Sequence, residues 1–193
     1  MTTDVYSFIP FTHENFDYVK RVVQLARDSR NKGAEGTLAA SLIYMNAVDY
    51  IASHLLDNFN NIEYLITYQE LKATIFKKEI RNRGVPLGKL INELEQFEFP
   101  DKTAFITDLQ TFNRYRINLA HNLMRLNPQQ IEQIDPDISV FWETAERLFD
   151  RYDTIIQNIT IIFESYRQQR GYRLPPPPVT ATNQEIYPPK TEG

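Results

Sequence analysis

Apolar side chains recur at every third or fourth position through most of the first 170 residues of this 193-residue chain. That spacing places them on one side of an α-helix, where they can be buried together. No segment of useful length alternates apolar and polar residues in the manner of a half-buried strand. We therefore expect an all-α fold, a bundle of four to six helices with a long C-terminal helix. The expected helices span residues 12–31, 37–58, 61–82, 87–97, 102–126 and 137–170.

The composition changes after residue 170. Four consecutive prolines occupy positions 175–178, and Pro188 and Pro189 follow in a polar context. Such a segment cannot bury enough apolar surface to fold by itself. We therefore expect a helical bundle over residues 1–170 and a Pro-rich, flexible, disordered tail over 171–193.

Charge and residue usage narrow the possible functions. The chain has no cysteine, which excludes disulfides, cysteine zinc sites and thiol catalysis. Its formal net charge is -4, so contact with a nucleic acid must come from a local patch rather than a global basic field. No apolar run approaches the roughly 18 residues that span a bilayer. We expect a cytoplasmic protein that has no membrane contact.

Two charged residues interrupt apolar stripes. Asp49 lies seven positions after Leu42 and seven before Leu56, and Arg116 lies four positions after Phe112. A charged group in such a place is costly to bury unless it is paired. We therefore expect Asp49 and Arg116 to lie close together, directly or through water. Such a pair could also serve only to fix the register of two helices.

One helix segment combines residues that suit chemistry on a phosphate. At about 100° per residue, Arg114, Asn118, His121 and Arg125 share one helix face, whereas Arg116 lies on the apolar side. An imidazole moves protons near neutral pH. A guanidinium binds a phosphate and stabilises developing negative charge. Cleavage of RNA by its own 2′-hydroxyl needs little more than these two groups.

The other histidines, the metal-binding motifs and the basic segment give weaker indications of function. His13 and His54 have no partners nearby in the sequence, and we expect ordinary surface residues. The three histidines lack the spacing of metal ligands, and no Gly-rich phosphate loop is present, so we expect no metal and no cofactor. Between residues 72 and 89, six cations accompany one acid. This patch is either an anion-binding surface or a solvated helix face.

Residues 116–121, Arg-Ile-Asn-Leu-Ala-His, resemble the Arg-x4–6-His motif of the HEPN superfamily, the higher-eukaryote and prokaryote nucleotide-binding helical domains. The first and the last three of these residues match the common form Arg-Asn-x-Leu-Ala-His. The helix that carries Asp49 is similar to a small, apolar helix of that family that often carries an acid. Ile117 departs from the pattern, because a polar residue usually follows the arginine. The resemblance spans residues 14–165, and the six-residue motif is its specific part.

The resemblance implies a metal-independent endoribonuclease of a toxin–antitoxin or phage-defence type, acting on RNA as a homodimer. In that scheme His121 is the general acid/base, Arg116 holds the scissile phosphate, Asn118 helps to position it, and Asp49 supports the arginine. Arg114 also satisfies the motif, so the catalytic arginine stays open between the two. An antitoxin or a defence-system protein would be the partner. Other family members have lost catalysis, which makes a helical interaction or adaptor module the alternative.

Overall fold

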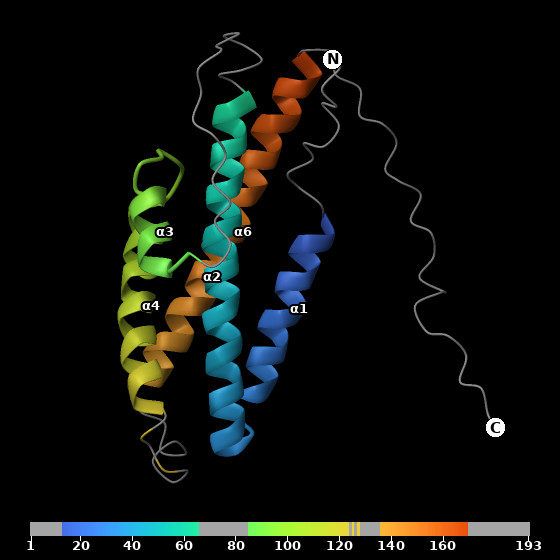
Figure 1. Cartoon of the computed structure of the whole chain (residues 1–193). Helices are drawn as coiled ribbons and strands as arrows, with labels where there is room; N and C mark the ends of the chain where they lie inside the picture. Colours follow the sequence, from blue (N-terminus) through green and yellow to red (C-terminus); the bar gives the residue numbers. More distant parts are fainter. Residues whose placement is uncertain (1–12, 66–84, 124, 126, 128–135, 170–193) are drawn as a thin grey trace, which may run out of the picture. The chain divides into compact units, whose positions relative to one another are not determined.

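The computed structural model describes residues 13–65, 85–123, 125, 127 and 136–169, and every regular element within them is a helix (Figure 1). The five helices of these residues are α1 His13–Ser29, α2 Gly33–Leu65, α3 Leu87–Leu94, α4 Lys102–Leu123 and α6 Pro136–Gln169. The expected all-α bundle with a long last helix is confirmed. The packing described below belongs to the compact unit that ends at Asn158, and the rest of α6 belongs to a second unit.

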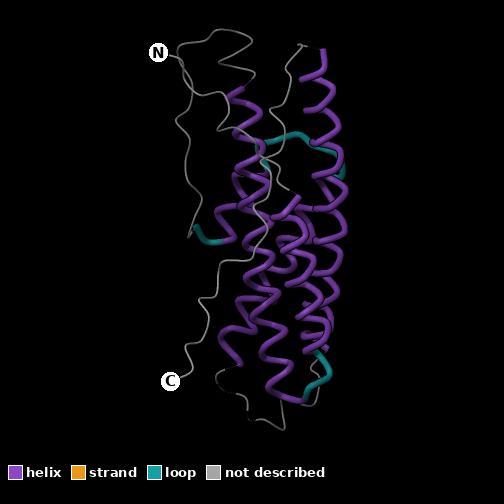
Figure 2. Tube along the Cα trace, turned by 90° about the vertical axis from the view of Figure 1, so that its right-hand side faces the viewer, coloured by secondary structure: helices purple, strands orange, loops and turns teal. Residues whose placement is uncertain are grey.

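α1 and α4 both run in the opposite direction to α2. A short turn joins α1 to α2, so these two helices are antiparallel. Asp49 of α2 pairs with Arg116 near the end of α4, whereas Phe59, further along α2, packs on Phe99, which contacts Phe105 near the start of α4. This reversed order makes α4 antiparallel to α2. Figure 1 shows α1 and α4 on either side of α2, and Figure 2 shows that the described elements are helices joined by loops.

The first part of α6 runs parallel to α2. Trp142 Nε1 lies 3.3 Å from Ser41 Oγ, and the Tyr152 hydroxyl lies 2.7 Å from His54 Nδ1, so residue numbers rise together along the two helices. Because α4 is antiparallel to α2, it is antiparallel to α6 as well. The result is an up-down-up-down arrangement in which α2 touches each of the other described helices.

α2 is buried over a broad arc instead of the single stripe predicted from Leu42 and Leu56. Leu56 is buried as expected, but Leu42 is 55% exposed, and Tyr44 is fully buried in its place. Small residues such as Ala40 and Ala47 are buried too, because they allow neighbouring helices to approach closely. A periodicity fitted to large side chains misses such positions, since a helix with several neighbours has no single inner face.

α2 also continues past Asn58, where the sequence predicted its end. The Asn58 side-chain amide donates a hydrogen bond to the backbone oxygen of His54 at 2.8 Å, so it bonds within the helix instead of ending it. The next residue, Phe59, is buried, with its ring centre 5.2 Å from that of Phe97 and 4.9 Å from that of Phe99. Burial of this aromatic side chain favours continuation of the helix.

Some expectations lie outside the described residues. They include most of the helix expected over 61–82, whose residues 61–65 belong to α2, most of the basic patch between 72 and 89, and the Pro-rich tail over 171–193. Within the described ranges, no helix combines the length and the apolar character that a membrane span requires.

The turn between α1 and α2 depends on a close approach at Gly36. A Cβ atom built on Gly36 would lie 2.2 Å from the backbone oxygen of Ser29 and 2.7 Å from the Cβ of Lys32. Backbone at this distance cannot move aside as a flexible side chain can. A Cβ on Gly88, in α3, would meet only Asn113 Nδ2, at an ordinary 3.6 Å.

We expect Gly36→Ala to lower the free energy of unfolding by about 1–3 kcal/mol, because the added methyl forces the α1–α2 turn apart. The matched variant Gly88→Ala should be neutral or stabilising by about 0.5 kcal/mol, since alanine is the better helix former. Urea unfolding followed by circular dichroism measures both variants. Equal effects of the two substitutions would show that the turn is not tightly packed.

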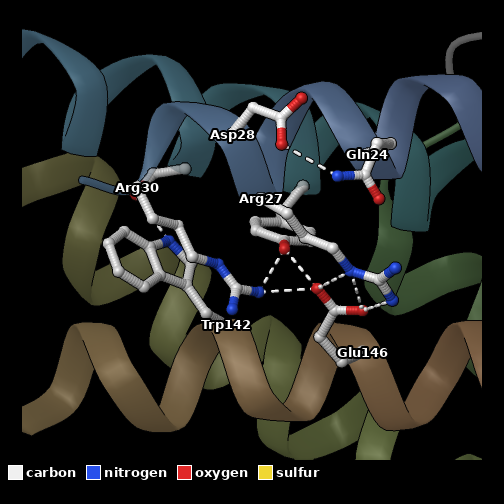
Figure 3. A network of polar contacts seen from close by, with 8 residues as sticks. Gln24, Arg27, Asp28, Arg30, Trp142 and Glu146 are labelled. Atoms are coloured by element: carbon white, nitrogen blue, oxygen red, sulfur yellow. Dashed lines mark hydrogen bonds and ion pairs between the residues drawn. The ribbon is translucent and has the colours of Figure 1, made fainter. Parts of the chain in front are cut away.

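Glu146 of α6 links three helices (Figure 3). Its Oε2 accepts a hydrogen bond from Arg27 at 2.5 Å, and its Oε1 accepts one from Arg30 at 2.6 Å and one from the Tyr44 hydroxyl. Both arginines belong to α1, and the tyrosine belongs to α2. The Arg30 guanidinium also lies 4.9 Å from the ring centre of Tyr44 and 5.2 Å from that of Trp142, within cation–π range.

The ionisation of this cluster follows from its contacts. Burial would raise the pKa of Glu146, but hydrogen bonds from Arg27 and Tyr44 outweigh it, so the pKa lies below its usual value. Burial, together with the hydrogen bond to Glu146, raises the pKa of Tyr44 and keeps the phenol a donor. The stabilising contribution of Glu146 is therefore present above the unfolded pKa of about 4.3 and is lost as pH falls through the folded value.

Replacement of Glu146 by Gln should lower the free energy of unfolding by about 2 kcal/mol at pH 7, because two guanidinium groups lose their counter-charge. The control is Glu143→Gln, at an exposed position of the same helix. Denaturant unfolding at pH 7 and at pH 3 gives the comparison. The difference between wild type and Glu146→Gln should shrink at pH 3, and a difference independent of pH would contradict an ionised Glu146.

Candidate functional site

Three of the predicted residues form an exposed surface on α4. Arg114, Asn118 and His121, here called the α4 face, are all exposed. Their spacings of four and three residues make them neighbours along one side of the helix. Ile117, 48% exposed, lies beside them, and Arg125 is exposed just beyond the helix end. The predicted grouping of these side chains on one helix face therefore corresponds to a surface open to solvent.

The carboxylate of α4 points away from this surface. Asp108, the single acid between Lys102 and Leu123, is 9% exposed. Its Oδ1 accepts a hydrogen bond from Arg147 at 3.1 Å, and its Oδ2 accepts one from Arg151 at 3.0 Å, both from α6. α4 therefore adds no acid of its own to the α4 face, which keeps that face attractive to an anion.

At its N-terminal end, the α4 face is bounded by a carboxylate, that of Glu95. The Arg114 guanidinium lies 5.3 Å from the ring centre of Tyr115. One helical turn before it, Gln110 donates a hydrogen bond of 2.8 Å to Glu95, which follows α3. A carboxylate thus lies one turn before Arg114, and the acid-free surface extends from Arg114 towards the C-terminal end of the helix.

Arg116 occupies a different side of α4. Its Nη1 lies 2.5 Å from Asp49 Oδ1, and the two side chains are 23% and 41% exposed. The predicted pairing of Asp49 with Arg116 is confirmed. Burial raises the pKa of Asp49, although the charge of Arg116 opposes that rise. The pair therefore joins α2 to α4 at a half-buried position.

The structure separates the two candidate arginines. Helix geometry places Arg116 about 140° around the axis from His121, whereas Arg114 lies within about 20° of it. Among the described residues, no hydrogen bond joins His121 to either arginine. The sequence predicted both arrangements, and the structure gives Arg114 the place beside His121 and Arg116 the place beside Asp49.

His54 is not the ordinary surface residue that we expected. Its Nδ1 lies 2.7 Å from the Tyr152 hydroxyl and 3.1 Å from Asn58 Nδ2, and its ring stacks on that of Tyr50 with centres 5.8 Å apart. Burial lowers the pKa of His54. The sequence did contain a signal, because Tyr50 and Asn58 lie four positions before and after His54 on the same helix face. Its partner on α6 could not be found without the fold.

Within the described residues, no set of three or more histidine, aspartate and glutamate side chains is arranged to hold a metal ion. Comparison of the chain with protein-family models, with curated proteins and with solved structures found no match. The assignment of a function therefore depends on the residues themselves.

The Asp49–Arg116 contact can be measured by a double-mutant cycle of Asp49→Asn and Arg116→Gln. We expect a coupling free energy of about 0.5–1 kcal/mol, because both side chains are partly solvated. Urea unfolding of the wild type, the two single variants and the double variant gives this value. Additive single effects would mean that the contact contributes nothing to stability.

Proposed function

We propose that this protein is a metal-independent endoribonuclease that acts in the cytoplasm as a homodimer. The observation that carries the proposal is the α4 face, where a histidine and an arginine share an exposed surface to which α4 adds no carboxylate. A phosphodiester can approach such a surface without repulsion from a neighbouring acid of that helix. The resemblance of residues 116–121 to the HEPN motif supports the same reaction class.

The chemistry would use few groups. His121 of one copy takes the proton of the 2′-hydroxyl, whose oxygen attacks phosphorus while the bond to the 5′-oxygen breaks. His121 of the second copy returns a proton to that leaving oxygen. Arg114 binds the phosphate and stabilises the charge that develops on its oxygens. The products are a 2′,3′-cyclic phosphate and a 5′-hydroxyl, and DNA is no substrate because it lacks the attacking group.

Arg114 and Arg116 would then have different roles. Arg114 contacts the phosphate from the α4 face, with Asn118 as a neighbouring hydrogen-bond donor. Arg116 acts as a positioning residue, held by Asp49, and fixes α4 against α2. This division departs from the role that the resemblance alone assigns to Arg116. An antitoxin or defence-system partner would act by covering the α4 face.

A second candidate function is a non-catalytic helical interaction module. The observation that favours it is the pairing of Arg116 with Asp49, which engages the motif arginine in a helix–helix contact. On this hypothesis His121 plays no chemical part, and the exposed Ile117 contributes to binding of a protein partner. The two functions differ in whether folded protein cleaves RNA at all.

Purified full-length protein should cleave single-stranded RNA in the presence of EDTA. His121→Ala should lower the rate by at least about 10²-fold, and Arg114→Ala by about 10-fold or more, because the proton acceptor or the phosphate contact is lost. Lys32→Ala, at an exposed position of the α1–α2 turn, should leave the rate unchanged. Gel analysis of labelled RNA, with end-group analysis of the products, measures these effects.

The controls separate catalysis from folding and contamination. Circular dichroism should show the same helix content in all variants. Undiminished cleavage by His121→Ala, or a requirement for added divalent metal, would overturn the proposed mechanism. No cleavage of any RNA by folded wild-type protein would favour the interaction module.

A further inference from the structure

The contact between Arg114 and Tyr115 is not imposed by the helix that carries both residues. Side chains of consecutive residues leave an α-helix about 100° apart and do not face each other. The guanidinium of Arg114 nevertheless lies over the Tyr115 ring, with its central carbon 5.3 Å from the ring centre. A long, exposed arginine side chain has many rotamers, so this contact restricts where the cation lies.

Tyr115 is placed to support the arginine. It is half-buried, whereas Arg114 is exposed, so the ring is the more constrained of the two side chains. Tyr115 also lies three positions before Asn118, a spacing that makes these two residues neighbours on the helix surface. The ring therefore borders the α4 face, next to residues that the proposed function uses.

Arg114 differs from Arg116 in what holds it. Arg116 donates a hydrogen bond to the carboxylate of Asp49, which compensates its charge. In the part of the chain that the structure describes, no hydrogen bond or ion pair engages Arg114, and Glu95 accepts a hydrogen bond from Gln110 instead. An aromatic ring attracts a cation through its quadrupole and carries no net charge. Arg114 is therefore oriented without being neutralised.

We propose that Tyr115 is a positioning residue, which holds the Arg114 guanidinium on the α4 face for a phosphate of single-stranded RNA. The inference rests on the proposed function, because it concerns the same surface and the same substrate. A cation that is already oriented loses fewer rotamers when the complex forms, so binding is tighter. A cation–π contact at an exposed site corresponds to about a two- to five-fold effect on an equilibrium constant. Tyr115 acts through Arg114 and does not itself touch the reacting atoms.

Binding can be measured without cleavage if the 2′-hydroxyls of the RNA are methylated, because the attacking group is then blocked. Fluorescence anisotropy of such a labelled, single-stranded RNA with the full-length protein gives the dissociation constant. Tyr115→Leu should weaken binding about two- to five-fold. Tyr115→Phe keeps the ring and should bind as tightly as the wild type. The matched control Tyr18→Leu, at an exposed tyrosine of α1, should leave binding unchanged.

The dependence of binding on salt separates positioning from loss of charge. For a single strand, each phosphate neutralised by a cation contributes about 0.7 to the slope of log K against log salt concentration. Arg114→Ala should reduce the size of that slope by about 0.7, because a cation is removed. Tyr115→Leu should lower the affinity and leave the slope unchanged, since Arg114 keeps its charge.

Nuclear magnetic resonance of the free protein tests the contact itself. The side-chain Nε–H signal of Arg114, assigned with Arg114→Lys, should move in Tyr115→Leu because the ring current of Tyr115 is lost. In Tyr115→Phe the signal should stay near its wild-type position. Circular dichroism should show equal helix content in all of these variants.

The positioning role would be overturned by wild-type protein that does not bind the methylated RNA, or by equal affinity of the wild type and Tyr115→Leu. It would also be overturned if Tyr115→Phe bound as weakly as Tyr115→Leu, or if the Arg114 signal did not respond to loss of the ring. Binding in the expected order of variants, without cleavage of unmodified RNA, would overturn the nuclease and keep the positioning role. Cleavage by a protein whose binding ignores Tyr115→Leu would do the reverse.

Discussion

The carboxylate of Glu146 joins α1, α2 and α6 through hydrogen bonds. Glu146 accepts hydrogen bonds from Arg27 and Arg30 of α1 and from Tyr44 of α2, and Arg30 lies between two aromatic rings. These contacts set how the three helices are rotated against one another, because an acceptor shared by three donors tolerates little sliding. Burial of apolar side chains is not directional, whereas the hydrogen bonds of this cluster depend on direction and therefore add orientation to the packing of the three helices.

The position of the α4 face depends on similar pairing. Asp108 ties α4 to Arg147 and Arg151 of α6, and Asp49 ties it to α2. Asp108 and Arg116 of α4 are both bound to neighbouring helices. The opposite side of α4 therefore faces the solvent. That side carries Arg114 and His121, so the internal ion pairs and the exposure of these two side chains are two consequences of one helix rotation.

Features that depend on the spacing of residues within a helix could be predicted from the sequence. Features that depend on the packing of several helices could not. Helical spacing predicted the all-α bundle, and two charges in apolar stripes predicted the Asp49–Arg116 contact. The expected burial of Leu42 was wrong, because α2 has several neighbours and no single buried side. The expected end of the helix at Asn58 was wrong, because the Asn58 side chain forms a hydrogen bond within the helix. His54 was misjudged because its partner Tyr152 lies almost a hundred positions away. Partners on distant helices become visible only once the chain has folded.

Because Asp108 points inwards, its ion pairs and the exposed charges of α4 respond differently to salt. Ions in solution screen charges at the surface over a distance of about 8–10 Å, but they act far less on pairs that are shielded from water. The side chain of Asp108 is 13% exposed, whereas Arg114 of the α4 face is open to solvent. Rising ionic strength therefore weakens the attraction of this surface for anions while the helices beneath it stay paired.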